Sequence, residues 1–462
     1  MFNLSNVTLF GNQGSRQPGN KPKRQSSGSH AAARPVRTHR LRNFFITLFT
    51  LIVLLEGFYF YLCYTNNAFI SRWRNIYVQT ALSTLSHQWL ATDLLPAKVV
   101  NATIERIDAG RKEQIDVNSS WDLPEQHVEK PNVVETIIDQ YKPPAEEDKP
   151  DEVETLPYWI RIDREGAETF FDIFGEIDPV TMLDYLDANP EVMDNGWAGI
   201  NIDKAGLDQN GTTIYTTNGD QVLAVNAVDG ILLIRVKGNS WRGILAIMKD
   251  PSRVGMCWSA GIGSYGQTVK QIAERNGAIL GVSGSGFIDP DGTGNGGTLA
   301  GYAMCGGNAR GYHAGGGFKR LELRSDDRFY ITDAYLPTND DTTDAVEFTP
   351  ALIVDGNVIV TEYTDWNGQQ PRTVLGQGLN GDIMFLDIEG RGAGGSLGLS
   401  TYICANILYD YGCVQSMNLD GGSSSIMYYN GRSITLCSNS SLTDGRYLPN
   451  AWLYWPSGSE PN

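Results

Sequence analysis

The most constraining feature of the chain is an uninterrupted apolar run near its start, residues 44–64, which read "FFITLFTLIVLLEGFYFYLCY". A run of about 20 apolar residues matches the thickness of the hydrocarbon core of a bilayer. It is longer than the roughly 7 to 15 apolar residues of a cleaved signal peptide, and no small-residue cleavage site follows it. We therefore predict a single transmembrane signal-anchor helix over residues 44–64.

The charge of the chain is divided unequally around this run. Residues 1–43 hold eight basic residues and no acidic ones, whereas the whole chain of 462 residues has a formal net charge of -17. Subtracting +8 from -17 leaves about -25 for the rest, which excludes nucleic acid as a partner. The positive-inside rule predicts a basic cytoplasmic tail over 1–43 and an extracytoplasmic body at the cell membrane. The tail could also contact anionic lipid headgroups.

Composition divides the remaining chain into four segments. Helically spaced apolar residues after the span predict a juxtamembrane stalk over 65–140, and prolines with six acidic residues predict an extended linker over 141–157. A short, partly helical accessory segment is expected over 158–215. Residues 216–458 form a glycine-rich body, and its oligomeric state is not predicted.

Strand and helix signals in the body occur without a regular βαβ order. Apolar runs such as "GILLIRV" and "GILAIM" predict strands, and "GQTVKQIAERNGA" predicts a helix that ends at Asn276-Gly277. A second helix is expected to begin at a Ser400 cap, and Asn430-Gly431 predicts a hairpin turn. We expect an α+β fold with a mixed β-sheet core and a few helices, in addition to the transmembrane helix.

The stretch "NLDGGSSS" is the first candidate site. The strand "CVQSMNL" delivers Asn418 and Asp420 to its tip, Gly421 and Gly422 let the backbone turn away, and the serines after them supply hydroxyl donors. The alternative is a purely structural turn in which Asp420 accepts hydrogen bonds from nearby backbone N–H groups. From spacing alone, that alternative is favoured.

Three further stretches place charged residues after apolar runs. Asp289 follows "LGVSGSGF", Arg372 precedes a short apolar run, and "FLDIEGR" sets Asp387 and Glu389 on one face of a strand with Arg391 beyond it. A carboxylate could stabilise an oxocarbenium-like centre or activate water, and guanidinium groups could bind phosphate bidentately. The pattern indicates hydrolysis of an anionic sugar substrate.

Other motifs carry less weight. "DPDGTGNGG" leaves room for a bound divalent cation but lacks the glutamate that closes a calcium-binding loop, so no cofactor and no metal ligands are predicted. "GIGSYG" fits a dinucleotide pattern without a clear βαβ unit, and His313 has no nucleophile elbow beside it. Five cysteines outside the span leave room for one disulfide, whose pairing cannot be read from spacing.

Six stretches in order carry a resemblance to a known family: "MKDPSRV", "GQTVKQIAERNGAILGVSGSGFIDPDG", "PRTVLGQ", "GDIMFLDIEGR", "NLDGGSSSIMYYNGR" and "GRYLPNAWLYW". Together they resemble the phosphodiester glycosidase domain, over about residues 220 to 456. That family includes the N-acetylglucosamine-1-phosphodiester alpha-N-acetylglucosaminidase, or uncovering enzyme, and many bacterial surface proteins. The chain looks like a membrane-anchored member of the bacterial type.

The resemblance implies hydrolysis of sugar-1-phosphodiesters, which releases free sugar and a phosphomonoester. It implies catalytic roles for Asp420 and Glu389. It implies substrate binding by ten residues: Arg372, Arg391, Asn418, Gly421, Gly422, Ser423, Ser424, Ser283, Gly286 and Asp289.

The chain departs from the family pattern at two positions. Ser283 stands where relatives usually have Asn, and Ser423 replaces a commoner third glycine. The leading hypothesis is an extracytoplasmic hydrolase that cleaves phosphodiester-linked sugars in a surface glycan or polymer such as an exopolysaccharide. The alternative is a catalytically inactive module that binds phosphorylated surface glycans.

Overall fold

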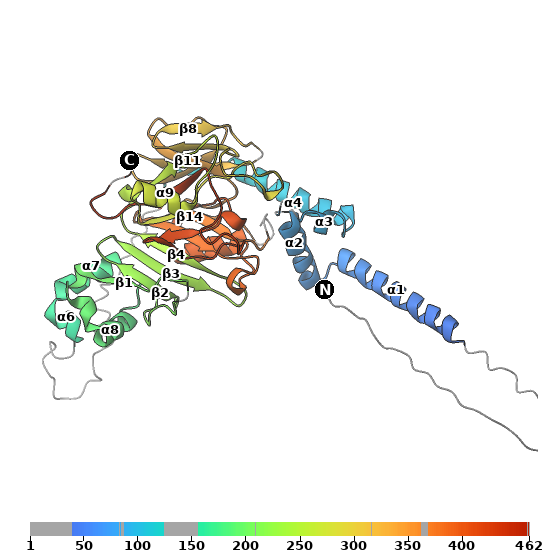
Figure 1. Cartoon of the computed structure of the whole chain (residues 1–462), viewed down its shortest axis with the longest axis horizontal. Coiled ribbons are helices and arrows are strands. Elements are labelled where there is room, and N and C mark those ends of the chain that lie inside the picture. Colours follow the sequence, from blue (N-terminus) through green and yellow to red (C-terminus); the bar gives the residue numbers. More distant parts are fainter. Residues whose placement is uncertain are drawn as a thin grey trace, which may run out of the picture. The chain divides into compact units, whose positions relative to one another are not determined.

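The computed structural model describes residues 39–82, 84, 87–123, 156–207, 209–315, 317–361, 368–459 and 461. Most of the predicted basic tail, the part of the stalk after residue 123 and the linker up to residue 155 lie outside the described residues. The chain divides into two compact units, Met1–Tyr59 and Phe60–Asn462. The α+β prediction is confirmed by three β-sheets accompanied by helices (Figure 1).

The predicted transmembrane helix corresponds to α1 (Arg40–Tyr64), whose apolar side chains are exposed. Among the described residues, α1 is the one helix long and apolar enough to cross a membrane. A membrane anchor and a signal sequence both satisfy this criterion of length and composition, so the criterion alone does not distinguish them. The helix ends before residues 65–67, and α2 (Ala68–Leu82) begins where Asn67 Oδ1 accepts the N–H of Ile70 at 3.2 Å.

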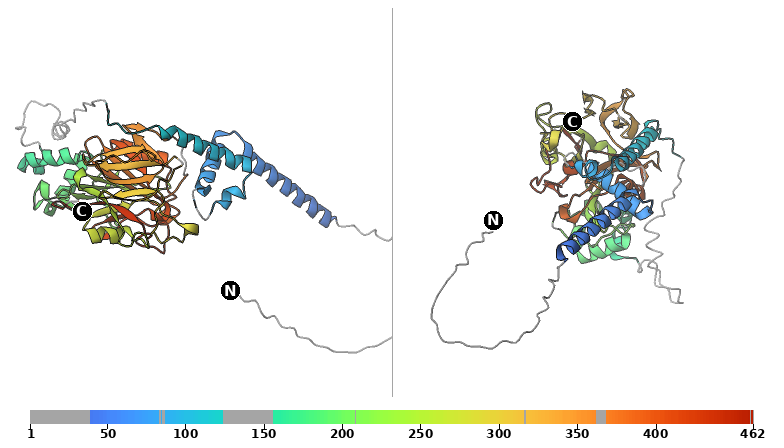
Figure 2. Two further views of the ribbon diagram at one scale, coloured as in Figure 1. Left: turned by 90° about the horizontal axis from the view of Figure 1, so that it is seen from above. Right: turned by 90° about the vertical axis from the view of Figure 1, so that its right-hand side faces the viewer.

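The stalk helices pack on the body within the second unit. α2 is followed by α3 (Trp89–Thr92) and α4 (Ala97–Ile115). Near the end of α4, Gln114 Nε2 donates to the Ala351 carbonyl at 3.1 Å, and Lys319 Nζ donates to the Ile115 carbonyl at 3.0 Å. Figure 2 shows α4 running to the sheets of the body.

The largest sheet has nine strands, and its recorded pairings are antiparallel. Its order is β1 (Asn201–Asp203), β2 (Gln221–Asn226), β3 (Ile231–Lys237), β4 (Arg242–Met248), β15 (Ile383–Ile388), β14 (Arg372–Gly378), β16 (Cys413–Asn418), β12 (Ala351–Val354) and β13 (Asn357–Val358). The central strands are buried throughout, because both faces of this sheet are covered.

Two five-stranded sheets complete the body. One has the order β10 (Phe329–Asp333), β9 (Lys319–Arg324), β11 (Thr342–Phe348), β7 (Tyr302–Cys305) and β8 (Asn308–Gly311). The other has the order β18 (Arg432–Ser433), β17 (Met427–Tyr429), β6 (Leu280–Ser283), β19 (Asn450–Tyr454) and β5 (Val254–Trp258). Side chains from all three sheets meet in one hydrophobic cluster, so the sheets share a core.

Helices cover the outer faces. α7 (Arg164–Ile173), α8 (Pro179–Ala188) and α10 (Thr401–Asp410) contribute to a second cluster on the other face of the nine-stranded sheet, and α6 (Tyr158–Ile162) lies beside α7. α9 (Val269–Asn276) covers the sheet that contains β6 and β19. Figure 1 shows α6, α7 and α8 grouped near β1.

Three local sequence predictions are confirmed. Gly277 ends α9 in the left-handed region at φ 67°, as predicted, and a capping box of Thr268 and Gln271 that was not predicted begins the helix. The Ser400 side chain caps α10 by accepting the N–H of Ile403. Asn430 and Gly431, both with positive φ, turn β17 into β18.

Candidate active site

The Asp420 loop lies where the nine-stranded sheet meets the sheet of β6. β16 ends at Asn418, and the next residues turn against the start of β14, since Gly422 N donates to the Pro371 carbonyl at 3.2 Å. A Cβ on Gly421 would lie 2.6 Å from that carbonyl oxygen, and Gly422 has φ +66°. Both glycines are therefore needed for the close approach of the two chains.

Asp420 is half-buried and surrounded by charges. Burial is the largest effect on its carboxyl group and raises its pKa to about 6. Hydrogen bonds from the Ser424 hydroxyl and the Gly421 N–H, and the charge of Arg446, oppose this rise, while Asp289 adds to it. Near neutral pH Asp420 is therefore mainly a carboxylate, and it takes up a proton under mildly acidic conditions.

Arg446 is one of two cations that interact electrostatically with Asp420 among the described residues. Both of its Nη atoms donate to the carboxylate of Asp289, from Nη2 to Oδ1 at 2.8 Å, and Nη2 also donates to the Gly294 carbonyl at 3.0 Å. Its guanidinium carbon lies 4.7 Å from the centre of the Phe287 ring. Arg446 lowers the pKa of the Asp289 carboxyl group, so Asp289 stays ionised and holds this guanidinium in place.

Arg391 is the other cation. It has the positive φ of 55°, which is uncommon for a residue other than glycine, and its Nε donates to Gln370 Oε1 at 2.9 Å. A Cβ on Gly422 would lie 3.0 Å from its Nη2. Burial lowers its pKa, and the carboxylate of Asp420 opposes that change. The side chain is partly open to solvent, so its charge faces the loop and water together.

A chain of hydroxyl groups connects the two sheets under the loop. Ser283 Oγ donates to Thr373 Oγ1 at 2.8 Å and lies 3.3 Å from the Asp420 carbonyl oxygen, and Thr373 Oγ1 donates to Asp387 Oδ2 at 3.3 Å. Burial raises the pKa of Asp387 to about 8, so its carboxyl group is protonated at neutral pH. Ser283, one of the departures from the family pattern, thus supports the backbone of the Asp420 loop.

Glu389 and Arg372 are held in buried contacts. Glu389 Oε2 pairs with Arg242, and its Oε1 accepts the N–H of Leu436 at 2.9 Å. Arg372 donates from Nε to the Leu399 carbonyl at 3.0 Å and from Nη2 to the Gly368 carbonyl at 2.8 Å. Both side chains therefore already interact with protein groups and shape the surroundings of Asp420.

The remaining predicted residues are distributed around this centre. Asn418 Nδ2 donates to the Thr349 carbonyl at 2.8 Å, and Ser424 is buried. The Ser423 carbonyl accepts the thiol of Cys437 at 3.4 Å. Gly286 is buried beneath the Phe348 ring, which would lie 3.2 Å from an added Cβ.

The structure thus gathers Asp420, Arg391 and Asp289 and adds residues that the sequence reasoning did not select. Arg446 lies in "GRYLPNAWLYW", one of the six stretches that carry the family resemblance, and that resemblance was the signal that could have pointed to it. Gln370 gave no signal, because its partners are far away in the chain.

The sequence leaves room for a bound divalent cation and for one disulfide. Within the part of the chain that the structure describes, no group of three or more His, Cys, Asp or Glu side chains is close enough to hold a metal ion. All six cysteines are described, and each is a free thiol.

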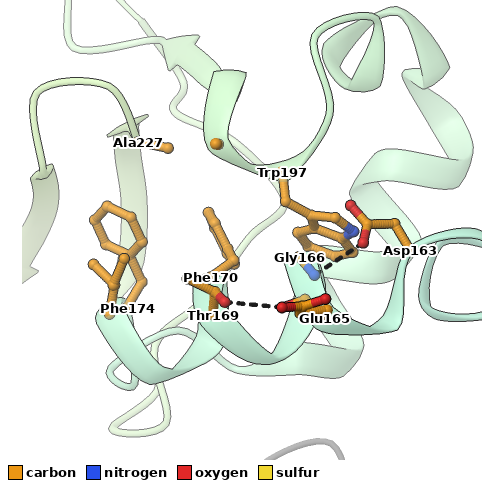
Figure 3. A pocket seen from close by; sticks show the side chains of 10 residues that line it. Asp163, Glu165, Gly166, Thr169, Phe170, Phe174, Trp197 and Ala227 are labelled. Carbon is orange, nitrogen blue, oxygen red and sulfur yellow. Dashed lines mark hydrogen bonds between the residues drawn. The ribbon is translucent and has the colours of Figure 1, made fainter.

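A separate cavity of about 320 Å³ lies in the accessory segment (Figure 3). It is lined mainly by α7 residues, together with Trp197, Ala198 and Ala227. None of the predicted site residues lines it.

Comparison with known protein families places these residues in context. Residues 276–455 match the model of the family described as phosphodiester glycosidase (NAGPA). This part of the chain is a phosphodiester glycosidase family domain. The match confirms the resemblance noted in the sequence, and Asp289, Arg391, Asp420 and Arg446 all lie within the NAGPA domain.

Similar solved structures are distant from this chain. The catalytic domain of zebrafish N-acetylglucosamine-1-phosphodiester alpha-N-acetylglucosaminidase, auto-inhibited by its pro-peptide, is 17% identical with a TM-score of 0.39, and the match covers 49% of this chain and 82% of that one. A hypothetical protein from Synechocystis is 12% identical with a TM-score of 0.37, covering 52% and 65% of the two chains. A putative exported protein from Burkholderia pseudomallei is 15% identical with a TM-score of 0.36, covering 47% and 74%. No curated protein sequence gives a significant match.

Proposed function

We propose that the NAGPA domain hydrolyses sugar-1-phosphodiesters in a surface glycan or polymer and releases free sugar and a phosphomonoester. The observation that carries the proposal is the electrostatic interaction of the Asp420 carboxylate with two guanidinium groups, those of Arg446 and of Arg391, which lies against Gly422 of the same loop. A phosphodiester-linked sugar combines an anionic phosphate with an anomeric carbon that becomes positive during cleavage. The guanidinium groups are positive where the phosphate is negative, and the Asp420 carboxylate is negative where the anomeric carbon becomes positive.

The chemistry requires few groups. Arg391 and Arg446 bind the non-bridging phosphate oxygens, and they stabilise the negative charge that the phosphate gains as a leaving group. Asp420 stabilises the positive anomeric carbon or accepts a proton from the attacking water. Water supplies the new hydroxyl of the sugar, the bond between the anomeric carbon and oxygen breaks, and that oxygen leaves with the phosphate. A phosphate leaving group needs little protonation, so no second acid is required.

The proposed location is outside the cytoplasm. The exposed apolar surface of α1 and the basic residues before it support a signal anchor with a cytoplasmic N-terminus. Protease added to intact cells should then digest the body but spare an epitope placed before residue 40. Digestion of that epitope, or protection of the body, would contradict this orientation.

The alternative is a binding module that recognises phosphorylated glycans without cleaving them. It is favoured by the contacts of Glu389, whose carboxylate already binds Arg242 and the N–H of Leu436, so that Asp420 is left as the one acid available of the two implied to be catalytic. Most glycosidases use a pair of carboxyl groups.

Sugar release by the full-length protein in detergent separates the two functions. UDP-GlcNAc or another GlcNAc-1-phosphodiester serves as the probe, with Asp420→Asn as the variant and Asp410→Asn, an exposed aspartate at the end of α10, as the matched control. The proposal predicts release by wild type and by Asp410→Asn, and a loss of at least about 100-fold in Asp420→Asn. Binding of the probes without release in wild type would instead establish the binding module.

A further inference from the structure

The loop before β14 rests on α2, the first helix after the candidate membrane span. Gln369 N donates to Thr80 Oγ1 at 3.2 Å, and Gln370 Nε2 donates to the Thr80 carbonyl at 3.2 Å. Gly368, at φ +54°, lies so close that an added Cβ would be 2.3 Å from Thr80 Oγ1. This close fit joins residues almost 300 positions apart in the sequence.

The same loop holds two arginines of the candidate site. The Gly368 carbonyl accepts Arg372 Nη2 at 2.8 Å, and Gln370 Oε1 accepts Arg391 Nε at 2.9 Å. The amide of Gln370 therefore uses its nitrogen to bind α2 and its oxygen to bind Arg391.

Arg391 depends on such support. Its backbone lies in the left-handed region at φ 55°, which is costly for a residue with a Cβ, and its long side chain is partly exposed. A flexible guanidinium loses affinity for an anion when its orientation has to be fixed at the moment of binding. The hydrogen bond from Nε to Gln370 fixes the plane of the guanidinium before an anion arrives.

We propose that Gln370 is a positioning residue and that α2 is part of the support of the active site. The contacts from Thr80 through Gln370 to Arg391 set the position of the guanidinium that binds substrate phosphate. Docking of α2 on the loop therefore controls phosphate affinity at the Asp420 site. This inference rests on the proposed function, since it takes a phosphate-bearing ligand as the partner of Arg391.

Full-length protein in detergent is used for the test, with four variants. Gln370→Ala removes both contacts, and Gln370→Glu keeps the acceptor for Arg391 but loses the donor to Thr80. Thr80→Val removes the acceptor for Gln369 N. Tyr77→Phe is the matched control, because it removes one hydrogen bond of the same helix, from the Tyr77 hydroxyl to the Leu90 carbonyl at 2.8 Å, without touching the loop.

The first readout is phosphate affinity, measured as Kd for inorganic phosphate and as KM for UDP-GlcNAc. We expect Gln370→Ala to weaken both about tenfold, the effect of one oriented hydrogen bond, and to lower kcat as well, because Arg391 also stabilises the charge on the leaving phosphate. Gln370→Glu should recover part of the loss, Thr80→Val should weaken affinity a few-fold, and Tyr77→Phe should match wild type. Wild-type phosphate binding without sugar release would refute the proposed hydrolysis and leave this inference testable through Kd alone.

The second readout is hydrogen–deuterium exchange, which needs no ligand and no turnover. We expect faster exchange in the peptides covering 368–372 and 389–393 in Thr80→Val and Gln370→Ala, with Tyr77→Phe unchanged. Unchanged exchange at 389–393 in Gln370→Ala, or a loss of kcat with unaltered Kd and KM, would overturn the inference. Wild-type protein that binds no phosphate at millimolar concentration would overturn it as well.

Discussion

Arg446 donates from both Nη atoms to the carboxylate oxygens of Asp289, across 157 residues of sequence. Both side chains are largely shielded from solvent, and the pair lies within the electrostatic reach of Asp420. The pair therefore presents an oriented guanidinium to the Asp420 loop.

Removing the charge of Asp289 should weaken substrate binding. Asp289→Asn keeps the shape but breaks the bidentate pairing, so KM for a GlcNAc-1-phosphodiester should rise about tenfold or more, as expected for loss of a hydrogen bond between charged groups. The matched control is Glu168→Gln, which breaks the exposed Arg164–Glu168 pair and should leave KM unchanged. An unaltered KM in Asp289→Asn would show that the position of Arg446 does not affect substrate binding.

The activity should fall at acidic pH, where Asp420 becomes protonated; this fall is the acidic limb of the pH–rate profile. The pKa of this carboxyl group is raised to about 6, and the reaction needs its ionised form, so kcat/KM should fall about tenfold per pH unit below about pH 6. Because the charge of Asp289 contributes to that rise, Asp289→Asn should move the limb to lower pH. A pH–rate profile measures both. A profile flat down to pH 4 would assign the reaction to another group.

Asp387 should make the protein less stable as pH rises. Its folded-state pKa is about 8, against about 3.9 for an unfolded aspartate, so the folded protein keeps a proton that the unfolded chain loses. The contribution to stability is fully present below about pH 4 and is lost progressively as pH rises to about 8. Melting temperatures between pH 4 and 8 should decline less in Asp387→Asn than in wild type. If the melting temperatures of wild type and Asp387→Asn changed in parallel with pH, burial would not raise the pKa of Asp387.

Gly421 should not tolerate a side chain. The methyl group of Gly421→Ala would lie 2.6 Å from the Pro371 carbonyl oxygen, so either the loop or the start of β14 has to move. We expect a loss of about 1–3 kcal/mol in the free energy of unfolding, together with a large loss of sugar release. Gly175→Ala is the control, because its Cβ would lie at an ordinary 3.5 Å from the Phe171 carbonyl oxygen. Chemical denaturation with parallel activity assays distinguishes them.

Local chemistry explains which parts could be predicted from the sequence. The stop of α9 at Gly277, the Ser400 cap of α10 and the Asn430-Gly431 turn depend on residues within a few positions of one another, and these were predicted correctly. The position of Asp420 at the tip of β16 also followed from its own strand and glycines.

The arrangement of the site depends on contacts that no local pattern encodes. The partnership of Arg446 with Asp289, and that of Gln370 with Thr80, exist only because distant strands and a stalk helix are brought together. The identification of Arg372 as a phosphate ligand stays a prediction, and its guanidinium now has backbone carbonyls as partners. Periodicity predicts which face of a strand a residue occupies, but not what covers that face.

The central claim is that the chain cleaves a sugar-1-phosphodiester on the anomeric side in a reaction that needs Asp420. The most direct test is hydrolysis of a GlcNAc-1-phosphodiester by the full-length protein in ¹⁸O-labelled water, followed by mass spectrometry of both products. The account predicts that the label enters the hydroxyl of the released sugar and that Asp420→Asn abolishes the reaction. Label in the phosphomonoester would mean attack at phosphorus, and would contradict the account.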